Sequence, residues 1–175
     1  LHVAIQSAFA WNDSHLHEFR LTTQSGKRLC FGLPVDGDYD RGPDGELLPV
    51  WKHIVADYLS AKSQRMAYLY DFGDDWEHAV IFEDSLPKGP GKKYPRCTAG
   101  ERCGPPDDCG GPPGYESLLE ILADPQDEEY ESSHVWAASM KGLRGKFDPE
   151  AFDEQAVKFA NPKPRLNRML RETGW

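Results

Sequence analysis

Several carboxylates and an imidazole crowd the residues around one short turn of this sequence. The run Tyr70-Asp71-Phe72-Gly73-Asp74-Asp75-Trp76-Glu77-His78 is followed a little further along by Glu83. Carboxylates together with a histidine can bind a divalent cation, or can share a proton as acid and base. We therefore take six residues as a candidate functional cluster: Asp71, Asp74, His78, Glu83, Tyr70 and Trp76.

Which of these groups meet depends on the register of the predicted hairpin. A three-residue loop sets Asp71 opposite Glu77, where the two carboxylates repel each other unless a cation lies between them. A two-residue loop instead sets Asp71 opposite His78 as an ordinary ion pair. The favoured alternative is a turn built by Gly and Asp, with Trp76 and the tyrosines in the core.

A second candidate is a loop in which Cys97, Cys103 and Cys109 recur at equal intervals. Thiolate–zinc bonds would hold a loop that is too rich in Gly and Pro for helix or strand. Common zinc sites separate paired cysteines by about two to four residues, which this loop does not, and the fourth ligand would have to be Cys30 or a histidine. Reduced structural cysteines are the favoured alternative, and a disulfide in an oxidised sample is a third.

Two histidines form a third candidate. His15 and His17 are two positions apart on a predicted strand, so both point the same way and could bind one metal ion. His17 shares its face with Phe19 and Leu21, however, which favours a buried, hydrogen-bonded histidine. The possible cofactor is therefore zinc or another divalent metal, and the sequence leaves open whether the chain is an enzyme.

The overall charge bears on the partner. Lys and Arg number 20 against 29 Asp and Glu, so the formal net charge is −9, and such a chain repels a phosphate backbone. No run of apolar residues approaches the length of a membrane span. We expect an unknown protein or small-molecule partner rather than nucleic acid or a membrane, with the cytoplasm as the default location for a chain of few cysteines. The chain begins inside a predicted helix, so we expect a trimmed N-terminus.

The elements that must position these residues follow from periodicity and from turn residues. In chain order we expect a helix over 1–10, a hairpin over 15–21 and 27–33, an irregular loop over 34–49, a short helix over 50–61, a hairpin over 66–72 and 76–82, a long loop over 87–114, and helices over 115–122 and 127–140. A last helix should begin with Asp148 as N-cap and Pro149 at the first helical position, with Phe147 and Phe152 as a hydrophobic staple, and should end at Pro162.

This order predicts an α+β fold, a mostly antiparallel sheet covered by helices, with long Gly/Pro-rich loops, as a single domain over residues 1–175. No strand, Gly-rich turn and helix follow one another, which argues against a nucleotide-binding parallel sheet. There is also no Gly-x-Ser-x-Gly elbow and no phosphate loop.

Long motifs along the chain resemble the plasmid pRiA4b ORF-3-like family. They are Leu1-His2-x-x-Ile5-Gln6-x-Ala8-Phe9-x-Trp11, His15-Leu16-His17-x-Phe19, Tyr70-Asp71-Phe72-Gly73-Asp74-x-Trp76-x-His78, Tyr94-Pro95-x-Cys97, Pro105-Pro106-Asp107-Asp108-Cys109-Gly110-Gly111-x-x-Gly114-Tyr115 and Phe147-Asp148-Pro149-Glu150-x-Phe152-Asp153. The chain departs from the family after Asp124-Pro125, where members often carry histidines, and between Trp136 and Phe147, which is longer than usual.

The resemblance implies a passenger protein of plasmids and insertion elements, and some members carry the label TnpR-type. We see no support for resolvase chemistry, because the acidic chain shows no serine nucleophile with clustered arginines. We expect a non-catalytic binding or interaction module. The alternative is a metal-dependent hydrolase or nuclease-like enzyme that uses the Asp/His/Glu hairpin.

Overall fold

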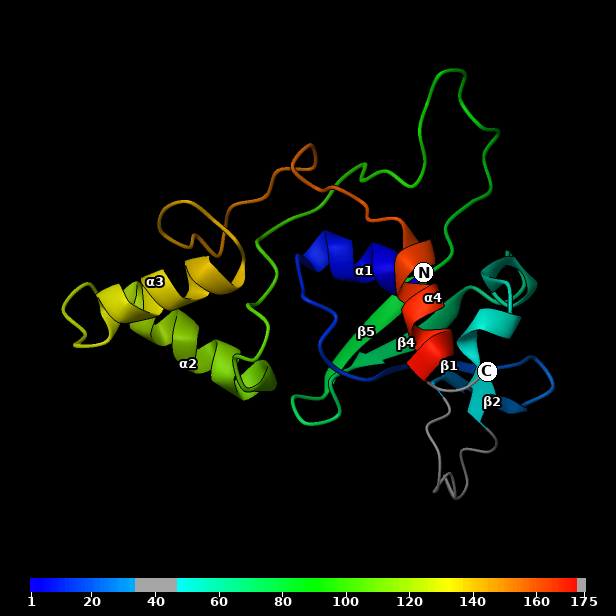
Figure 1. Cartoon of the computed structure of the whole chain (residues 1–175), viewed down its shortest axis with the longest axis horizontal. Helices are drawn as coiled ribbons and strands as arrows, with labels where there is room; N and C mark the ends of the chain where they lie inside the picture. The colour runs from blue at the N-terminus through cyan, green and yellow to red at the C-terminus, as the bar shows by residue number, and fades with distance from the viewer. Residues whose placement is uncertain (34–46, 173–175) are drawn as a thin grey trace. The chain divides into compact units, whose positions relative to one another are not determined.

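The computed structural model describes residues 1–33 and 47–172 of the chain, which forms two compact units (Figure 1). Unit 1 consists of residues 1–14 and 93–161, and unit 2 consists of residues 15–92 and 162–175. The single domain over 1–175 stays a prediction.

Unit 2 is built on a five-stranded sheet in the order β3-β2-β1-β4-β5. The strands are β1 (His17–Thr22), β2 (Arg28–Gly32), β3 (Leu47–Pro49), β4 (Arg65–Tyr70) and β5 (Trp76–Ile81). β2 and β3 pair in parallel, and the other neighbouring strands pair antiparallel. Together with the helices, this mostly antiparallel sheet confirms the predicted α+β class.

The apolar alternation of the sequence becomes one aromatic face of this sheet. Phe19 of β1 lies opposite Phe31 of β2 and Tyr68 of β4, so the three rings share a face. Tyr68 and Tyr70 are fully buried, and their rings are stacked with centroids 6.5 Å apart. Burial of these rings stabilises unit 2, together with the buried aliphatic side chains of the same sheet.

Two predictions between the hairpins of unit 2 are wrong. The helix expected over 50–61 is replaced by two short 3-10 turns, η2 (Val50–Lys52) and η3 (Val55–Asp57). His53 and Ile54 between them have extended backbones, so helical hydrogen bonding cannot continue. The loop expected over 34–49 ends in β3 instead, and its residues 34–46 lie outside the described residues.

Unit 1 contains α1 (His2–Phe9), α2 (Gly111–Ala123) and α3 (Tyr130–Met140). α2 and α3 lie side by side (Figure 1), and their shared core consists of buried Leu118, Ala137, Ala138 and Phe147. The two alanines allow the helices to approach closely. Gly114 has no room for a Cβ atom, because it passes directly over the carbonyl oxygen of Cys109 as the first turn of α2 forms.

The last predicted helix is misplaced. Residues 148–161 contain turns but no helix, and α4 (Pro162–Glu172), in unit 2, begins at the proline that was expected to end the helix. The carbonyl of Pro149, which would accept a helical hydrogen bond, accepts one from the Cys103 N–H at 2.9 Å. The expected staple does not form, because Phe147 enters the core of α2 and α3 while the Phe152 ring lies against Gly100.

Within the described ranges, we find no helix whose length and apolar content would let it cross a bilayer.

Candidate functional site

The turn that carries the predicted acidic cluster has five residues. Tyr70 pairs with Trp76 across β4 and β5, so residues 71–75 form the loop. Asp71 and Asp75 adopt left-handed backbones with φ of 57° and 56°, and the Asp71 carboxylate accepts the Gly73 N–H at 2.9 Å. Both registers considered from the sequence are therefore wrong. They assumed loops of two or three residues, whereas the left-handed Asp71 and Asp75 belong to a loop of five.

The six residues of the cluster separate into distinct environments. Tyr70 and Trp76 are buried in the sheet core, which confirms the structural interpretation of these two side chains. His78 lies opposite Tyr68, with the two ring centroids 5.8 Å apart. Asp74 is half-buried in the turn, whereas Glu83 follows β5 and is exposed.

The structure brings Asp71 together with His15 rather than with His78. The His15 Nε2 atom lies 3.5 Å from Asp71 Oδ2, and the backbone N–H of Asp71 donates to the Leu16 carbonyl at 2.9 Å. The His15 ring also meets the Tyr70 ring edge-on at 5.8 Å. A partly buried imidazole and carboxylate at this distance form an ion pair when the histidine is protonated.

His17 does not point at this pair. It is 2 % exposed, and its ring lies among Phe19 and Tyr68, at centroid distances of 5.9 and 6.0 Å. This burial confirms the buried histidine favoured from the sequence.

The metal-binding sets considered from the sequence do not assemble within residues 1–33 and 47–172. Neither the hairpin acids with His78 nor the three cysteines form a group whose ligand atoms lie within 4.8 Å of one another. A metal ion at either place stays a prediction.

Burial lowers the pKa of His78, although hydrogen bonding with the Tyr68 and Trp76 backbones acts in the opposite direction. The folded state therefore binds a proton less readily than the unfolded state, whose histidine pKa is near 6.5. We expect the free energy of unfolding to fall as the pH is lowered through and below about 6.5. Urea denaturation between pH 7 and 5 measures this, and the His78→Phe variant should show a smaller loss; an equal loss in both proteins would contradict the assignment.

In unit 1, the cysteine loop is tied to a buried lysine that the sequence analysis did not identify. Lys141 follows α3, is 8 % exposed, and its ammonium donates to the carbonyl oxygens of Phe9 and of Pro105, the latter at 3.3 Å. Phe9 is the last residue of α1, so its carbonyl has no acceptor role within that helix. The Lys141 ammonium thus supplies a hydrogen-bond donor to the C-terminus of α1 and links that helix to the loop that contains Pro105.

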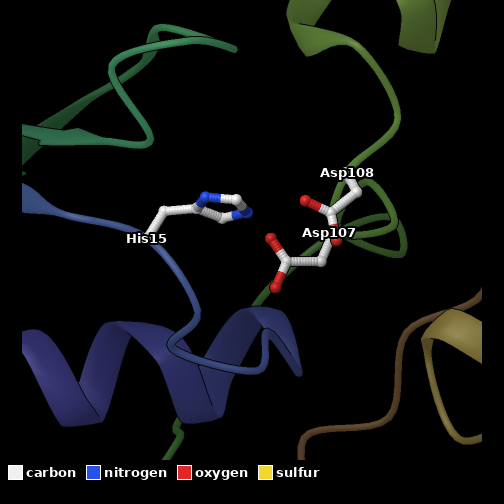
Figure 2. Close-up of side chains that lie close together, drawn as sticks. All are labelled: His15, Asp107 and Asp108. Atoms are coloured by element: carbon white, nitrogen blue, oxygen red, sulfur yellow. The ribbon is translucent and has the colours of Figure 1, made fainter.

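Asp107 ties the same loop to the segment after α1. It is 1 % exposed, and its Oδ2 atom accepts the Asn12 N–H at 3.0 Å and the Ser14 hydroxyl at 3.3 Å. Figure 2 shows Asp107 and Asp108 on the loop that leads into α2, and His15 on the segment that follows α1. The Trp11 indole donates to the Pro105 carbonyl at 3.0 Å and completes the attachment.

The electrostatics around Cys103 do not activate its thiol. Burial raises the pKa of Cys103, and the nearby Lys141 charge only partly offsets that effect. Burial also lowers the pKa of Lys141, against the opposing influence of Cys103, Asp107 and Cys109. Because the thiolate is the reactive form, Cys103 is a poorer nucleophile than an exposed cysteine. The Cys97 thiol donates to the Ala99 carbonyl at 3.4 Å within its own loop.

The outer surface of α2 and α3 combines two kinds of side chain. On α3 the residues that face away from the packed core include Val135, 69 % exposed, and Trp136, 38 % exposed. On α2 the exposed positions include Glu116 and Glu120. The sequence analysis missed this surface, although the helical spacing of residues 131–140 could have shown two large apolar residues on the polar side of α3.

Three comparisons place these features among known proteins. The family model described as plasmid pRiA4b ORF-3-like protein matches residues 1–156. The uncharacterized protein y4hQ of Sinorhizobium fredii is 38% identical over 169 residues, which cover 94% of this chain and 82% of that protein. The crystal structure of MM3350, a protein of unknown function from Methanosarcina mazei Go1, is 38% identical with a TM-score of 0.75, over 90% of this chain and 81% of that one.

Proposed function

Because the chain belongs to the plasmid pRiA4b ORF-3-like family, we propose that it is a non-catalytic interaction module associated with mobile genetic elements. Its binding surface is the helical hairpin of α2 and α3. Its proposed location is the cytoplasm, where free thiols such as the four in this chain are maintained.

The observation that carries the proposal is the exposed pair Val135 and Trp136. The inner face of α3 already packs on α2 through Ala137 and Ala138, so this pair has no role in that core. Tryptophan is among the residues that contribute most to binding free energy, because it buries a large area at low entropic cost. An exposed tryptophan beside an exposed valine on a rigid helix is a suitable anchor for another protein.

Replacing Trp136 by Ser tests this proposal. We expect the variant to lose at least about tenfold in affinity for any protein that the wild-type chain captures, because loss of an interface anchor costs more than about 1.4 kcal/mol. The measurement is crosslinking and affinity capture from extracts, followed by titration of the captured protein. Leu86→Ser, at a residue of unit 2 that is 78 % exposed, is the matched control.

A captured protein that binds the Trp136→Ser and Leu86→Ser variants equally well would contradict the proposed surface. The thermal unfolding midpoint of Leu86→Ser should stay close to that of the wild type, whereas that of Trp136→Ser should fall, because Trp136 is only 38 % exposed and its replacement also removes packing. The titrations are therefore carried out well below both midpoints. Catalytic turnover that copurifies with the chain would contradict a non-catalytic role.

A further inference from the structure

The net charge of the chain is concentrated in one segment. Residues 103–140, which contain α2 and α3, include nine Asp or Glu residues and no Lys or Arg. Since the whole chain has 29 acidic and 20 basic residues, the remainder has 29 − 9 = 20 acidic and 20 basic residues. The segment 103–140 therefore accounts for the entire formal charge of −9, and seven of its nine acidic residues lie in α2, in α3 or in the connection between these helices.

On α2 the acidic residues form a stripe. Glu116, Glu120 and Asp124 are spaced by four, so they lie one above the other on one side of the helix and its end, and all three are exposed. Like charges at this spacing destabilise a helix. Among the described residues, no hydrogen bond or ion pair involves the carboxylates of Glu116 or Glu120. Of the three, the Asp124 carboxylate has a role in the fold, because it accepts the Gln126 N–H at 2.9 Å, whereas the two glutamates remain available to another molecule.

The exposed residues of α3 include one acidic residue and two large apolar residues, besides Ser132 and Ser139. Glu131 is paired with Lys146 at 2.8 Å, and that ammonium also lies over the Tyr130 ring, 4.8 Å from its centre. One turn further along α3, Val135 and Trp136 are exposed. Since α2 and α3 lie side by side (Figure 1), the carboxylates of α2 and the exposed apolar pair of α3 belong to the same helical hairpin.

We propose that the partner of this hairpin is a Lys/Arg-rich polypeptide segment that also carries apolar residues. This inference rests on the proposed function and names the chemistry of its partner. The α2 stripe extends over about 12 Å of helix, which matches a row of basic side chains better than one small ion. Arginine also stacks well on tryptophan, so Trp136 can bind the same segment. Nucleic acid is repelled by the same carboxylates.

The experiment compares two triple variants of the full chain that have the same net charge. One neutralises the stripe, as Glu116→Gln, Glu120→Gln and Asp124→Asn. The other neutralises three exposed residues of unit 2, as Asp57→Asn, Glu77→Gln and Asp84→Asn. Both reduce the formal charge from −9 to −6. The probe is a labelled peptide of about 16 residues, mostly Lys and Arg with Leu at every fourth position, and binding is measured by fluorescence anisotropy.

We expect the stripe variant to bind the peptide at least about tenfold more weakly than the wild type, and the control variant to lose less than about threefold. The affinity of the wild type should fall with added salt. Equal losses in both variants would overturn the inference, because the peptide would then sense net charge alone. Tighter binding of a single-stranded oligonucleotide than of the peptide would also overturn it.

The two proposals fail separately. If Trp136→Ser abolishes capture of a natural partner while the stripe variant retains it, the hairpin is an interaction surface for a partner that is not basic. If the stripe variant loses affinity for the basic peptide but Trp136→Ser captures the same proteins as the wild type, the carboxylates recognise a basic segment without Trp136 as the anchor.

Discussion

Replacing Arg20 by Met is expected to lower the free energy of unfolding by about 3 kcal/mol, because it removes the cation from a fully buried carboxylate. Glu18 is 0 % exposed on β1, and the Arg20 guanidinium is its ion-pair partner. The Cys30 thiol donates to the other carboxylate oxygen at 3.2 Å and remains in the variant. The Arg20 side chain is itself 46 % exposed, so the expected loss lies at the lower end for a broken buried pair.

A double variant separates loss of the cation from loss of packing. Glu18→Gln combined with Arg20→Met removes both charges, so it should be more stable than Arg20→Met alone. Arg65→Met, at an exposed arginine on β4, should change stability by less than about 0.5 kcal/mol. Urea denaturation followed by circular dichroism measures all three. If Arg20→Met behaves like Arg65→Met, the buried pair has no such role.

Local periodicity predicts the parts of this fold that depend on neighbouring residues. The alternation around Phe19 and Tyr68 identifies β1 and β4, because an apolar residue at every second position suits a strand with one buried face. The loop between β4 and β5 was missed because Asp71 and Asp75 take left-handed backbones, which no alternation reveals. Asp71 is therefore a residue of the loop and does not lie opposite His78.

Contacts between distant segments explain the other differences. Capping signals at Asp148 and Pro149 resemble those of a real helix start, but the Pro149 carbonyl is occupied by the N–H of Cys103, a residue of a remote loop. Lys141 was not singled out, because nothing near it in the sequence shows that it binds the end of α1. The acidic hairpin is different: counting charges along the chain, rather than over the whole chain, reveals it.

Removal of the Asp107 carboxylate in unit 1 should lower the free energy of unfolding about as much as Arg20→Met does in unit 2. Asp107→Ala loses two hydrogen bonds to a buried charged acceptor, from the Asn12 N–H and the Ser14 hydroxyl. Hydrogen bonds to charged groups contribute about 1.5–3 kcal/mol each, so we expect a loss of about 3 kcal/mol in the free energy of unfolding. Asp107→Asn keeps an oxygen acceptor and should lose less.

The pH dependence of the Asn variant distinguishes the charge of Asp107 from its hydrogen bonds. The carboxylate raises the pKa of Lys141 against the larger lowering by burial, so its neutralisation lowers the pKa of that lysine further. A depressed lysine pKa destabilises the folded state below that pKa, and the penalty declines as the pH rises from that pKa toward the ordinary value of 10.5. The stability deficit of Asp107→Asn relative to the wild type should therefore shrink between pH 7 and 10 in urea denaturation. A constant deficit would mean that Asp107 acts through its hydrogen bonds alone, without holding the charge of Lys141 in place.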